Sequence, residues 1–216
     1  LDTPLAGDFT RRCETGVKNG DCLAACFVVA LEAMAFGCVY KQCKEPGARA
    51  MRAELVRWIK DNWNQKPIFQ PETRVHEIMY LQHDLGITEY ERANRPPWPE
   101  DPEGRLAAYA AICDTVYLSD AEMLLFSCML FEKRGVLMFF RTYRCTGVRS
   151  NIGEYISTTP EPSIVMNCLD CTEAVIVDVA HSGALDGASA HYKLLEGSGS
   201  LNGLLVVTDP PRHART

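Results

Sequence analysis

The residue best placed to act as a nucleophile is Cys22, which lies where a polar turn meets a long apolar stretch. Apolar residues recur four apart after it, at Leu23, Phe27 and Leu31, which is the spacing of a buried helix face. Asp21 is a favourable N-cap residue, so we expect Cys22 to be the first residue of a helix. There the unpaired backbone N–H groups and the helix dipole favour a thiolate and can stabilise an oxyanion. The pattern indicates a catalytic thiol, and the alternative is one buried cysteine among ten.

A thiol nucleophile needs a base, and histidine is the usual one. Two of the five histidines, His181 and His191, lie in the later part of the chain, where strand-like patterns dominate. His191 follows a loop of small residues and begins a strand-like stretch, which is a good platform for a side chain directed at a helix N-terminus. His181 precedes that loop and is the weaker candidate. An early cysteine with a late histidine is the chain order of papain-like active sites.

The elements that must position these residues follow from hydrophobic periodicity and capping signals. Helices are expected over residues 22–35, 48–62, 72–85, 105–114 and 119–134. Strands are expected over residues 136–140, 173–179, 191–195 and 204–207. Ser119 and Glu122 form a capping-box pattern, and Gly135 is placed to end the same helix. Helices followed by strands predict an α+β fold in which the cysteine helix packs on a sheet.

The length of 216 residues predicts one domain, and hydrophobic residues at 47% supply a substantial core. We expect an N-terminal arm at 1–17, a single domain over 10–208 with an accessory helical lobe at 64–113, and a flexible tail at 209–216. The net charge of −6 argues against a nucleic-acid binder and suits a partner with a basic face. Residues 22–40 are strongly apolar, but Glu32 at their centre favours a buried helix over a membrane span.

Three polar side chains are expected near the surface, with the two histidines among them either exposed or half-buried. Arg52 lies off the apolar stripe of the second expected helix, and His76 and His83 have no partner at metal-ligand spacing. Trp98 lies in the proline-rich stretch 94–104, where it is interpreted either as a clasp onto the core or as an exposed contact residue.

The ten cysteines are best explained as reduced thiols. Disulfide scaffolds are usually short and poor in core residues, whereas here Cys26, Cys113 and Cys128 lie inside apolar runs of a longer chain. A reducing compartment is therefore expected. Structural zinc is the alternative, because Cys168-x-x-Cys171 has a ligand-like spacing, but no second close pair accompanies it and we predict no metal site.

Three motifs resemble the ovarian-tumour (OTU) family of cysteine proteases and deubiquitinases. Asn19-Gly20-Asp21-Cys22-Leu23 resembles the cysteine box of that family, D-G-(D/N)-C-(L/F). His191-Tyr192, followed by Leu194-Leu195, is similar to its histidine box at the start of a strand. Ser119–Arg134, followed by Val136–Phe140, resembles its acidic-capped helix that leads into a central strand. The motifs occur in the family's order between residues 10 and 208.

The resemblance implies a papain-like OTU fold, with helices packed on a small central mixed β-sheet and an enlarged helical segment between the cysteine helix and the sheet. It implies a thiol-dependent deubiquitinase that hydrolyses isopeptide bonds at the ubiquitin C-terminus through an acyl-enzyme, with Cys22 as nucleophile and His191 as base and acid. The implied partner is ubiquitin, polyubiquitin or a ubiquitin-like modifier, and no cofactor is needed. The implied location is the cytoplasm, or the host cytosol for an effector. Trp98 and Tyr192 are candidate substrate contacts.

Two positions depart from the family's pattern and leave the third catalytic residue open. Asn19 stands where the family usually has Asp, and Lys193 stands two residues after the histidine, where the family often has Asp or Asn. A lysine cannot accept the imidazole N–H, so another group must orient the ring. Asp8 or Glu14 is a candidate for that role, while Asn19 and Asp21 are candidates for supporting the oxyanion or the histidine.

Two other functions fit the same residues. The first is a viral or effector cysteine protease of the same fold that processes a polyprotein, since Leu1 at the start is compatible with release from a longer chain. The second is a catalytically inactive ubiquitin-binding module, which the departures at Asn19 and Lys193 favour.

Overall fold

The computed structural model describes residues 9–13, 20–36, 42–85, 97–146, 151–161, 165, 173–182, 191–197 and 204–208. The helices are α1 (Cys22–Phe36), α2 (Glu45–Asp61), α3 (Val75–Tyr80), the π-helical turn η2 (Leu81–Leu85), α5 (Pro102–Ile112) and α6 (Asp120–Arg134). The strands are β1 (Phe9–Cys13), β2 (Val136–Thr146), β3 (Asn151–Thr159), β4 (Glu173–Ser182), β5 (His191–Gly197) and β6 (Leu204–Thr208). The fold class is α+β, as the sequence predicts.

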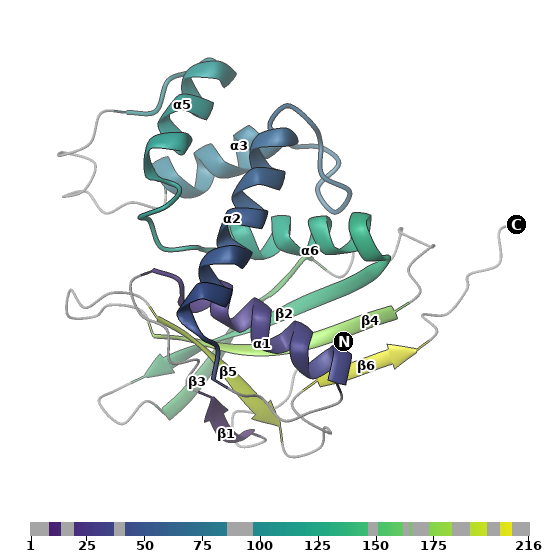
Figure 1. Ribbon diagram of the computed structural model, residues 1–216. Helices are drawn as coiled ribbons and strands as arrows, with labels where there is room; N and C mark the ends of the chain where they lie inside the picture. Colours follow the sequence, from purple (N-terminus) through teal and green to yellow (C-terminus); the bar gives the residue numbers. More distant parts are fainter. Residues whose placement is uncertain are drawn as a thin grey trace, which may run out of the picture.

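The described strands form one mixed sheet in the order β1-β5-β4-β2-β3, and β6 pairs with β4 next to β5. The central pair, β2 and β4, is parallel, and the other pairs are antiparallel. The helices lie on one side of the sheet, with α1 and α6 nearest to it and α3 and α5 farthest away (Figure 1). Because α1 contacts β5, the first residue of α1 comes to the start of that strand.

Aromatic side chains fix α1 and α6 on the central strand β2. Phe27 of α1 stacks on Phe126 of α6 with ring centroids 4.0 Å apart, and both rings pack against Phe140 of β2. All three are fully buried, and each contributes about 1.5–3 kcal/mol of hydrophobic free energy. The buried hydroxyl of Ser127 donates to the Met138 carbonyl at 2.6 Å, which joins α6 to β2.

Both ends of α6 are set by local signals that the sequence reveals. Glu122 accepts hydrogen bonds from the backbone N–H of Ser119 at 2.8 Å and from the Ser119 hydroxyl. Gly135 has a φ of 67°, a left-handed conformation that glycine adopts without steric cost. The predicted capping box is therefore confirmed, and so is the predicted buried strand that follows it, where Phe139 and Phe140 are both buried on opposite faces.

The predicted boundaries of several elements differ from the structure. Strand β1 lies inside the expected arm at 1–17, and this edge strand forms by backbone pairing with β5 rather than from an apolar alternation. Strand β3 lies in a stretch without a predicted strand. Helices α2 and α5 begin at Glu45 and Pro102, three residues before the predicted starts, because proline is tolerated in a first helical turn.

Three side chains expected near the surface are buried, and those expectations are wrong. Arg52, His76 and His83 are 4%, 4% and 8% exposed. Arg52 and His83 each pair with a carboxylate from a distant segment, which the periodicity of one helix cannot reveal. Trp98 is half-buried against the core and stacks on His83. Of its two interpretations, the clasp onto the core is therefore the one that agrees with the structure.

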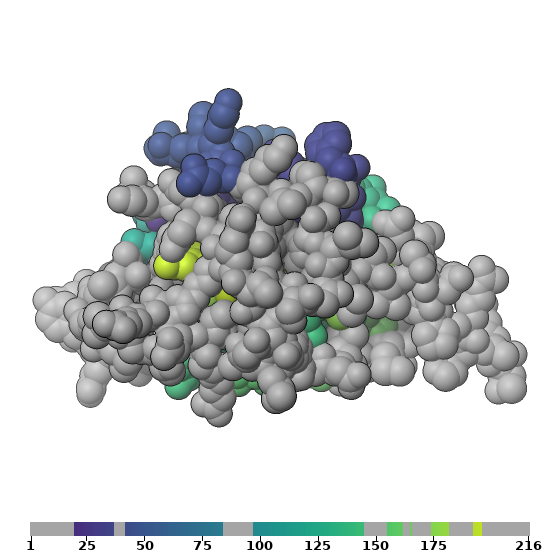
Figure 2. Space-filling model, turned by 90° about the horizontal axis from the view of Figure 1, so that it is seen from below, coloured from purple at the N-terminus to yellow at the C-terminus, as the bar shows by residue number. Residues whose placement is uncertain are grey.

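Helices α3, η2 and α5 come from the segment 64–113. Helices α3 and α5 lie farther from the sheet than α6 does (Figure 1). Residues 86–96 of this segment and the expected tail at 209–216 lie outside the described residues. Seen from the sheet side, α2 lies at one rim of the molecule, in blue (Figure 2). In the described parts of the chain, no helix has the length and apolar character needed to cross a membrane.

Candidate active site

Cys22 is the first residue of α1, and it lies against the start of β5, 170 residues further along the chain. The backbone N–H of Tyr192 donates to Cys22 Sγ at 3.5 Å. Tyr192 directly follows His191, whose backbone pairs with Ser182 of β4, while the side chain of His191 lies outside the described part of the structure. The fold therefore brings the predicted nucleophile beside the strand residue that adjoins the predicted base.

Burial controls the ionisation of the candidate nucleophile. Cys22 is 1% exposed, and desolvation raises the pKa of its thiol above the usual value. The backbone N–H groups of Tyr192 and Leu23 and the charge of Arg52 act in the opposite direction without outweighing burial. The thiolate that the helix N-terminus alone predicts is therefore not the resting form. The thiol is protonated at neutral pH, so attack on a carbonyl requires a base.

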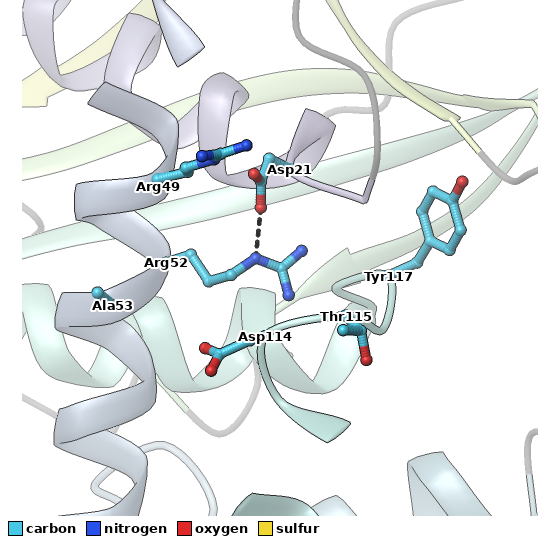
Figure 3. A pocket seen from close by; sticks show the side chains of 7 residues that line it. All are labelled: Asp21, Arg49, Arg52, Ala53, Asp114, Thr115 and Tyr117. Atoms are coloured by element: carbon cyan, nitrogen blue, oxygen red, sulfur yellow. Dashed lines mark hydrogen bonds and ion pairs between the residues drawn. The ribbon is translucent and has the colours of Figure 1, made fainter. Parts of the chain in front are cut away.

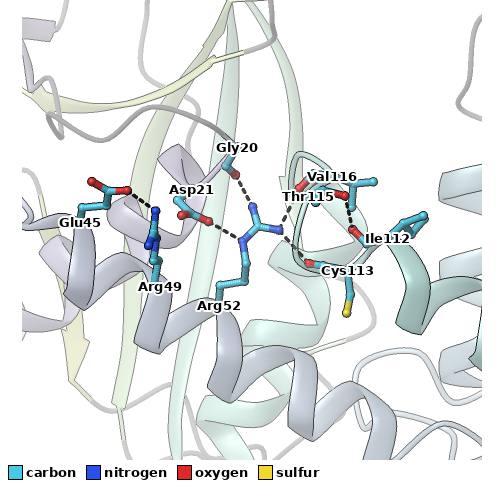
Figure 4. Close-up of polar contacts among 9 residues, drawn as sticks. All are labelled: Gly20, Asp21, Glu45, Arg49, Arg52, Ile112, Cys113, Thr115 and Val116. Carbon is cyan, nitrogen blue, oxygen red and sulfur yellow. Dashed lines mark hydrogen bonds and ion pairs between the residues drawn. The ribbon is translucent and has the colours of Figure 1, made fainter.

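The turn before α1 is held by Arg52, a buried side chain of α2 (Figure 4). Its Nε donates to the Asp21 carboxylate at 2.5 Å, and its Nη2 donates to the Gly20 carbonyl at 2.5 Å. Its Nη1 donates to the carbonyls of Cys113 and Val116 at 2.9 and 2.8 Å, on the segment that follows α5. One guanidinium thus joins three segments that are far apart in the sequence.

Tyr192 links the start of β5 to α6. Its hydroxyl donates to Asp120 Oδ1 at 3.2 Å, and its ring stacks on His181 of β4 with centroids 4.6 Å apart. Tyr192 is buried, so its side chain supports the site from the protein interior. Burial lowers the pKa of His181, and the nearby Asp120 acts in the opposite direction. His181 is therefore neutral at pH 7, which makes it a second candidate base in the same region.

A polar cluster surrounds Glu122 in the first turn of α6, and beyond the predicted Ser119 cap its contact with His83 is one that the sequence does not reveal. Glu122 is fully buried, and its Oε1 lies 3.1 Å from His83 Nε2, while Ser119 donates to its other oxygen. Burial raises the pKa of Glu122, but these hydrogen bonds outweigh it and hold the pKa below its usual value. His83 also stacks on Trp98. The first turn of α6 therefore contacts both the α3–α5 region, through Glu122, and the cysteine site, through Asp120.

Two hollows adjoin these groups. One, of about 560 Å³, lies beside the cysteine turn and is lined by Asp21, Arg49, Arg52, Ala53, Asp114, Thr115 and Tyr117. Arg49 and Arg52 enter it from α2, while Thr115 and Tyr117 come from the segment after α5 (Figure 3). The other, of about 400 Å³, includes Asp120 and the exposed Leu81 in its lining. Both hollows therefore border a residue that contacts the cysteine site.

The remaining predicted site residues, Asp8, Glu14 and Asn19, lie outside the described residues, as do Cys168 and Cys171. Within the described ranges, no group of three or more His, Cys, Asp or Glu side chains is arranged to hold a metal ion. Five cysteines whose side chains the structure describes are buried, namely Cys22, Cys26, Cys43, Cys113 and Cys128.

Comparison with known proteins assigns no family. Neither a protein-family model, nor a curated protein, nor a solved structure matches the chain. The case for a function therefore depends on the residues and contacts of the site itself.

Proposed function

We propose that the chain is a thiol-dependent deubiquitinase of the OTU type, which hydrolyses isopeptide bonds at the ubiquitin C-terminus. The observation that carries the proposal is the contact between Cys22 Sγ and the N–H of Tyr192, the residue that adjoins His191. A cysteine box and a histidine box must meet in this way if they act on one substrate. The position of α1 over a mixed sheet supports the same proposal.

The proposed chemistry starts from a protonated thiol. His191 takes the proton from Cys22 Sγ, and the thiolate attacks the carbonyl carbon of the isopeptide bond. Backbone N–H groups at the start of α1 stabilise the resulting oxyanion. When the intermediate collapses, the C–N bond breaks, the lysine amine leaves with the proton from His191, and ubiquitin remains as a thioester on Cys22. His191 then deprotonates a water molecule, which attacks the thioester and releases the ubiquitin carboxylate together with the free thiol.

Ubiquitin or polyubiquitin is the proposed partner, with a ubiquitin-like modifier as the nearest variant. The net charge of −6 suits a basic protein face. Five described cysteines are buried in the interior, where cysteines of a chain of this length are best explained as reduced thiols, which suits a reducing compartment such as the cytosol.

A ubiquitin-binding module without hydrolase activity is the second candidate. It is favoured by the burial of Cys22 and by the raised pKa of its thiol. In that case the same surface holds the ubiquitin tail and no thioester forms.

The test is hydrolysis of diubiquitin, and of ubiquitin with a fluorogenic C-terminal amide, by the wild type and by Cys22→Ala, His191→Ala and His181→Ala. We expect the first two substitutions to lower kcat/KM by about 10³-fold or more, because each removes a group that acts on the reacting atoms. We expect His181→Ala to change kcat/KM by less than about 10-fold. Ubiquitin binding without turnover in the wild type would favour the binding module, and the absence of both would contradict both proposals.

A further inference from the structure

We propose that Arg52 is a positioning residue for the Cys22 nucleophile, because its guanidinium fixes the Gly20–Asp21 turn from which α1 starts (Figure 4). The catalytic consequence of this inference rests on the proposed function. Its first readout is the reactivity of the Cys22 thiol, which is independent of ubiquitin.

The contacts of Arg52 require a planar, multiply donating side chain. Four hydrogen bonds of 2.5–2.9 Å leave the guanidinium, one from Nε and three from the two Nη atoms. The ion pair with Asp21 is nearly fully buried on both sides. A lysine carries a point charge with no such fork, so it cannot reach acceptors that surround the guanidinium. Arg52→Lys therefore keeps the positive charge and removes most of the four hydrogen bonds.

The backbone of Gly20 has a conformation that allows the Arg52 guanidinium to approach closely. Gly20 has a φ of +84°, which L side chains rarely adopt, and a Cβ there would lie 3.3 Å from Arg52 Nη2 and 3.4 Å from the Val116 carbonyl oxygen. The peptide group is planar and trans, so a Gly20 carbonyl held by Arg52 forces the N–H of Asp21 to point the opposite way. Arg52 thus sets the direction of a backbone N–H group directly before Cys22, where an oxyanion donor is needed.

The other half of the guanidinium anchors this turn to a second helix. Cys113 is the C-cap of α5, and its carbonyl belongs to the electronegative end of that helix. Helix α5 is itself held by the stacking of Tyr109 on Trp63, with centroids 5.5 Å apart, and by the Trp63 Nε1 hydrogen bond to the Pro102 carbonyl at 2.7 Å. The cysteine turn is therefore fixed to packed helices through one side chain.

The experiment measures the alkylation rate of Cys22 by iodoacetamide against pH, followed by mass spectrometry of the Cys22 peptide, together with kcat and KM on ubiquitin with a fluorogenic C-terminal amide. The variants are Arg52→Lys and the matched control Arg49→Lys. Arg49 lies one turn earlier on α2 and lines the same hollow, but it is 68% exposed and pairs with Glu45. Thermal unfolding establishes that each variant is folded.

We expect Arg52→Lys to shift the midpoint of the alkylation profile and to lower kcat by about 10²-fold with KM changed by less than about 3-fold, since displaced reacting groups lower the rate of the bound complex. Arg49→Lys is expected to match the wild type in both. A folded Arg52→Lys protein with the wild-type alkylation profile and the wild-type kcat would overturn the proposal.

Two further outcomes separate this inference from the proposed function. A shifted alkylation profile in Arg52→Lys, with a wild type that does not hydrolyse ubiquitin, leaves the positioning role intact and contradicts the deubiquitinase. If Arg52→Lys does not fold, Asp21→Asn decides, because it keeps the shape of the side chain and removes the ion pair alone. We then expect kcat to fall by about 10-fold at unchanged KM. A folded Asp21→Asn protein with wild-type kcat would overturn the positioning role.

Discussion

Two buried arginine–aspartate pairs hold different parts of this protein, and they do so in different ways. Arg141 and Asp178 lie opposite each other on the neighbouring strands β2 and β4 and form two hydrogen bonds of 2.6 and 2.7 Å. Arg52 donates once to Asp21, at 2.5 Å, and its other hydrogen bonds go to main-chain carbonyls of two further segments.

A buried ion pair affects stability alone where the backbone already fixes the geometry, and it also sets the geometry where separate segments meet at it. Arg141 bridges two strands whose register is already determined by the backbone ladder of the sheet. Arg52 joins a glycine turn, a helix and the end of another helix, and it determines how these meet. Loss of Arg141 should therefore lower stability, whereas loss of Arg52 should also change the chemistry of Cys22.

The largest effect on stability is expected from Arg141→Met. The substitution leaves the Asp178 carboxylate buried without its arginine, which should lower the free energy of unfolding by about 3–5 kcal/mol. Urea denaturation measures this loss, and the alkylation profile of Cys22 in the folded protein should stay that of the wild type. A changed Cys22 profile would contradict the proposed division between the two pairs.

Two further variants test the cause of the loss expected in Arg141→Met, namely Arg144→Met and the double variant of Arg141 and Asp178. Arg144 lies on the same strand but is exposed, so its replacement should change stability by less than about 0.5 kcal/mol. Arg141→Met with Asp178→Leu replaces both charges by apolar groups and should recover much of the loss, because no unpaired charge remains. A double variant as unstable as Arg141→Met would show that the unpaired carboxylate is not the cause.

The Glu122–His83 pair gives an intermediate case. Glu122→Gln weakens the contact with His83 and the cap at Ser119, and it should lower the free energy of unfolding by about 1–3 kcal/mol. The control is Glu132→Gln on the same helix, where the carboxylate is exposed and accepts from Trp58 Nε1 at 3.1 Å. Equal losses in the two variants would contradict the importance of burial at Glu122.

A pH dependence of stability is expected from His76. Burial lowers the pKa of its ring, and Nδ1 lies 3.3 Å from Arg105 Nη1, which can only donate, so the folded protein favours the neutral ring. The unfolded chain binds this proton near pH 6.5 and the folded chain only at lower pH, so stability falls as pH decreases through that window. Urea denaturation at pH 7.5 and 5.5 should show a smaller fall in His76→Gln than in the wild type. Equal falls would contradict this assignment.

The smallest effect is expected from Arg49→Ala. Its ion pair with Glu45 at 2.5 Å joins two side chains that are 68% and 52% exposed, so water screens it. Stability should change by less than about 0.5 kcal/mol, measured by thermal unfolding. A loss comparable to that of Arg141→Met would mean that burial does not separate these pairs.

Sequence patterns predict the parts of the fold whose causes are local. The apolar spacing after Cys22 gives α1, while the Ser119–Glu122 cap and Gly135 give the ends of α6. Strands β1 and β3 escape prediction because backbone pairing with distant strands defines them, not an apolar alternation.

The candidate site is predictable only in part for the same reason. The cysteine and histidine boxes are each local in the sequence and can be recognised without the fold. Their resemblance to those of a family is what predicts that Cys22 and His191 act together. Three of the four acceptors of Arg52 are main-chain carbonyls, up to 64 residues away, which leave no trace in side-chain patterns. The burial of the Cys22 thiol, which reverses the direction expected from the helix N-terminus, also depends on the tertiary packing around it.

Whether Cys22 is the nucleophile of a deubiquitinase is tested by a reaction with ubiquitin that carries an electrophile at its C-terminus, followed by tandem mass spectrometry of the adduct. We expect one ubiquitin per chain, attached through Cys22 Sγ, with no adduct in Cys22→Ala and a much slower reaction in His191→Ala. An adduct on another cysteine, or none on a folded wild-type protein, would contradict the assignment of Cys22 as the nucleophile of a deubiquitinase.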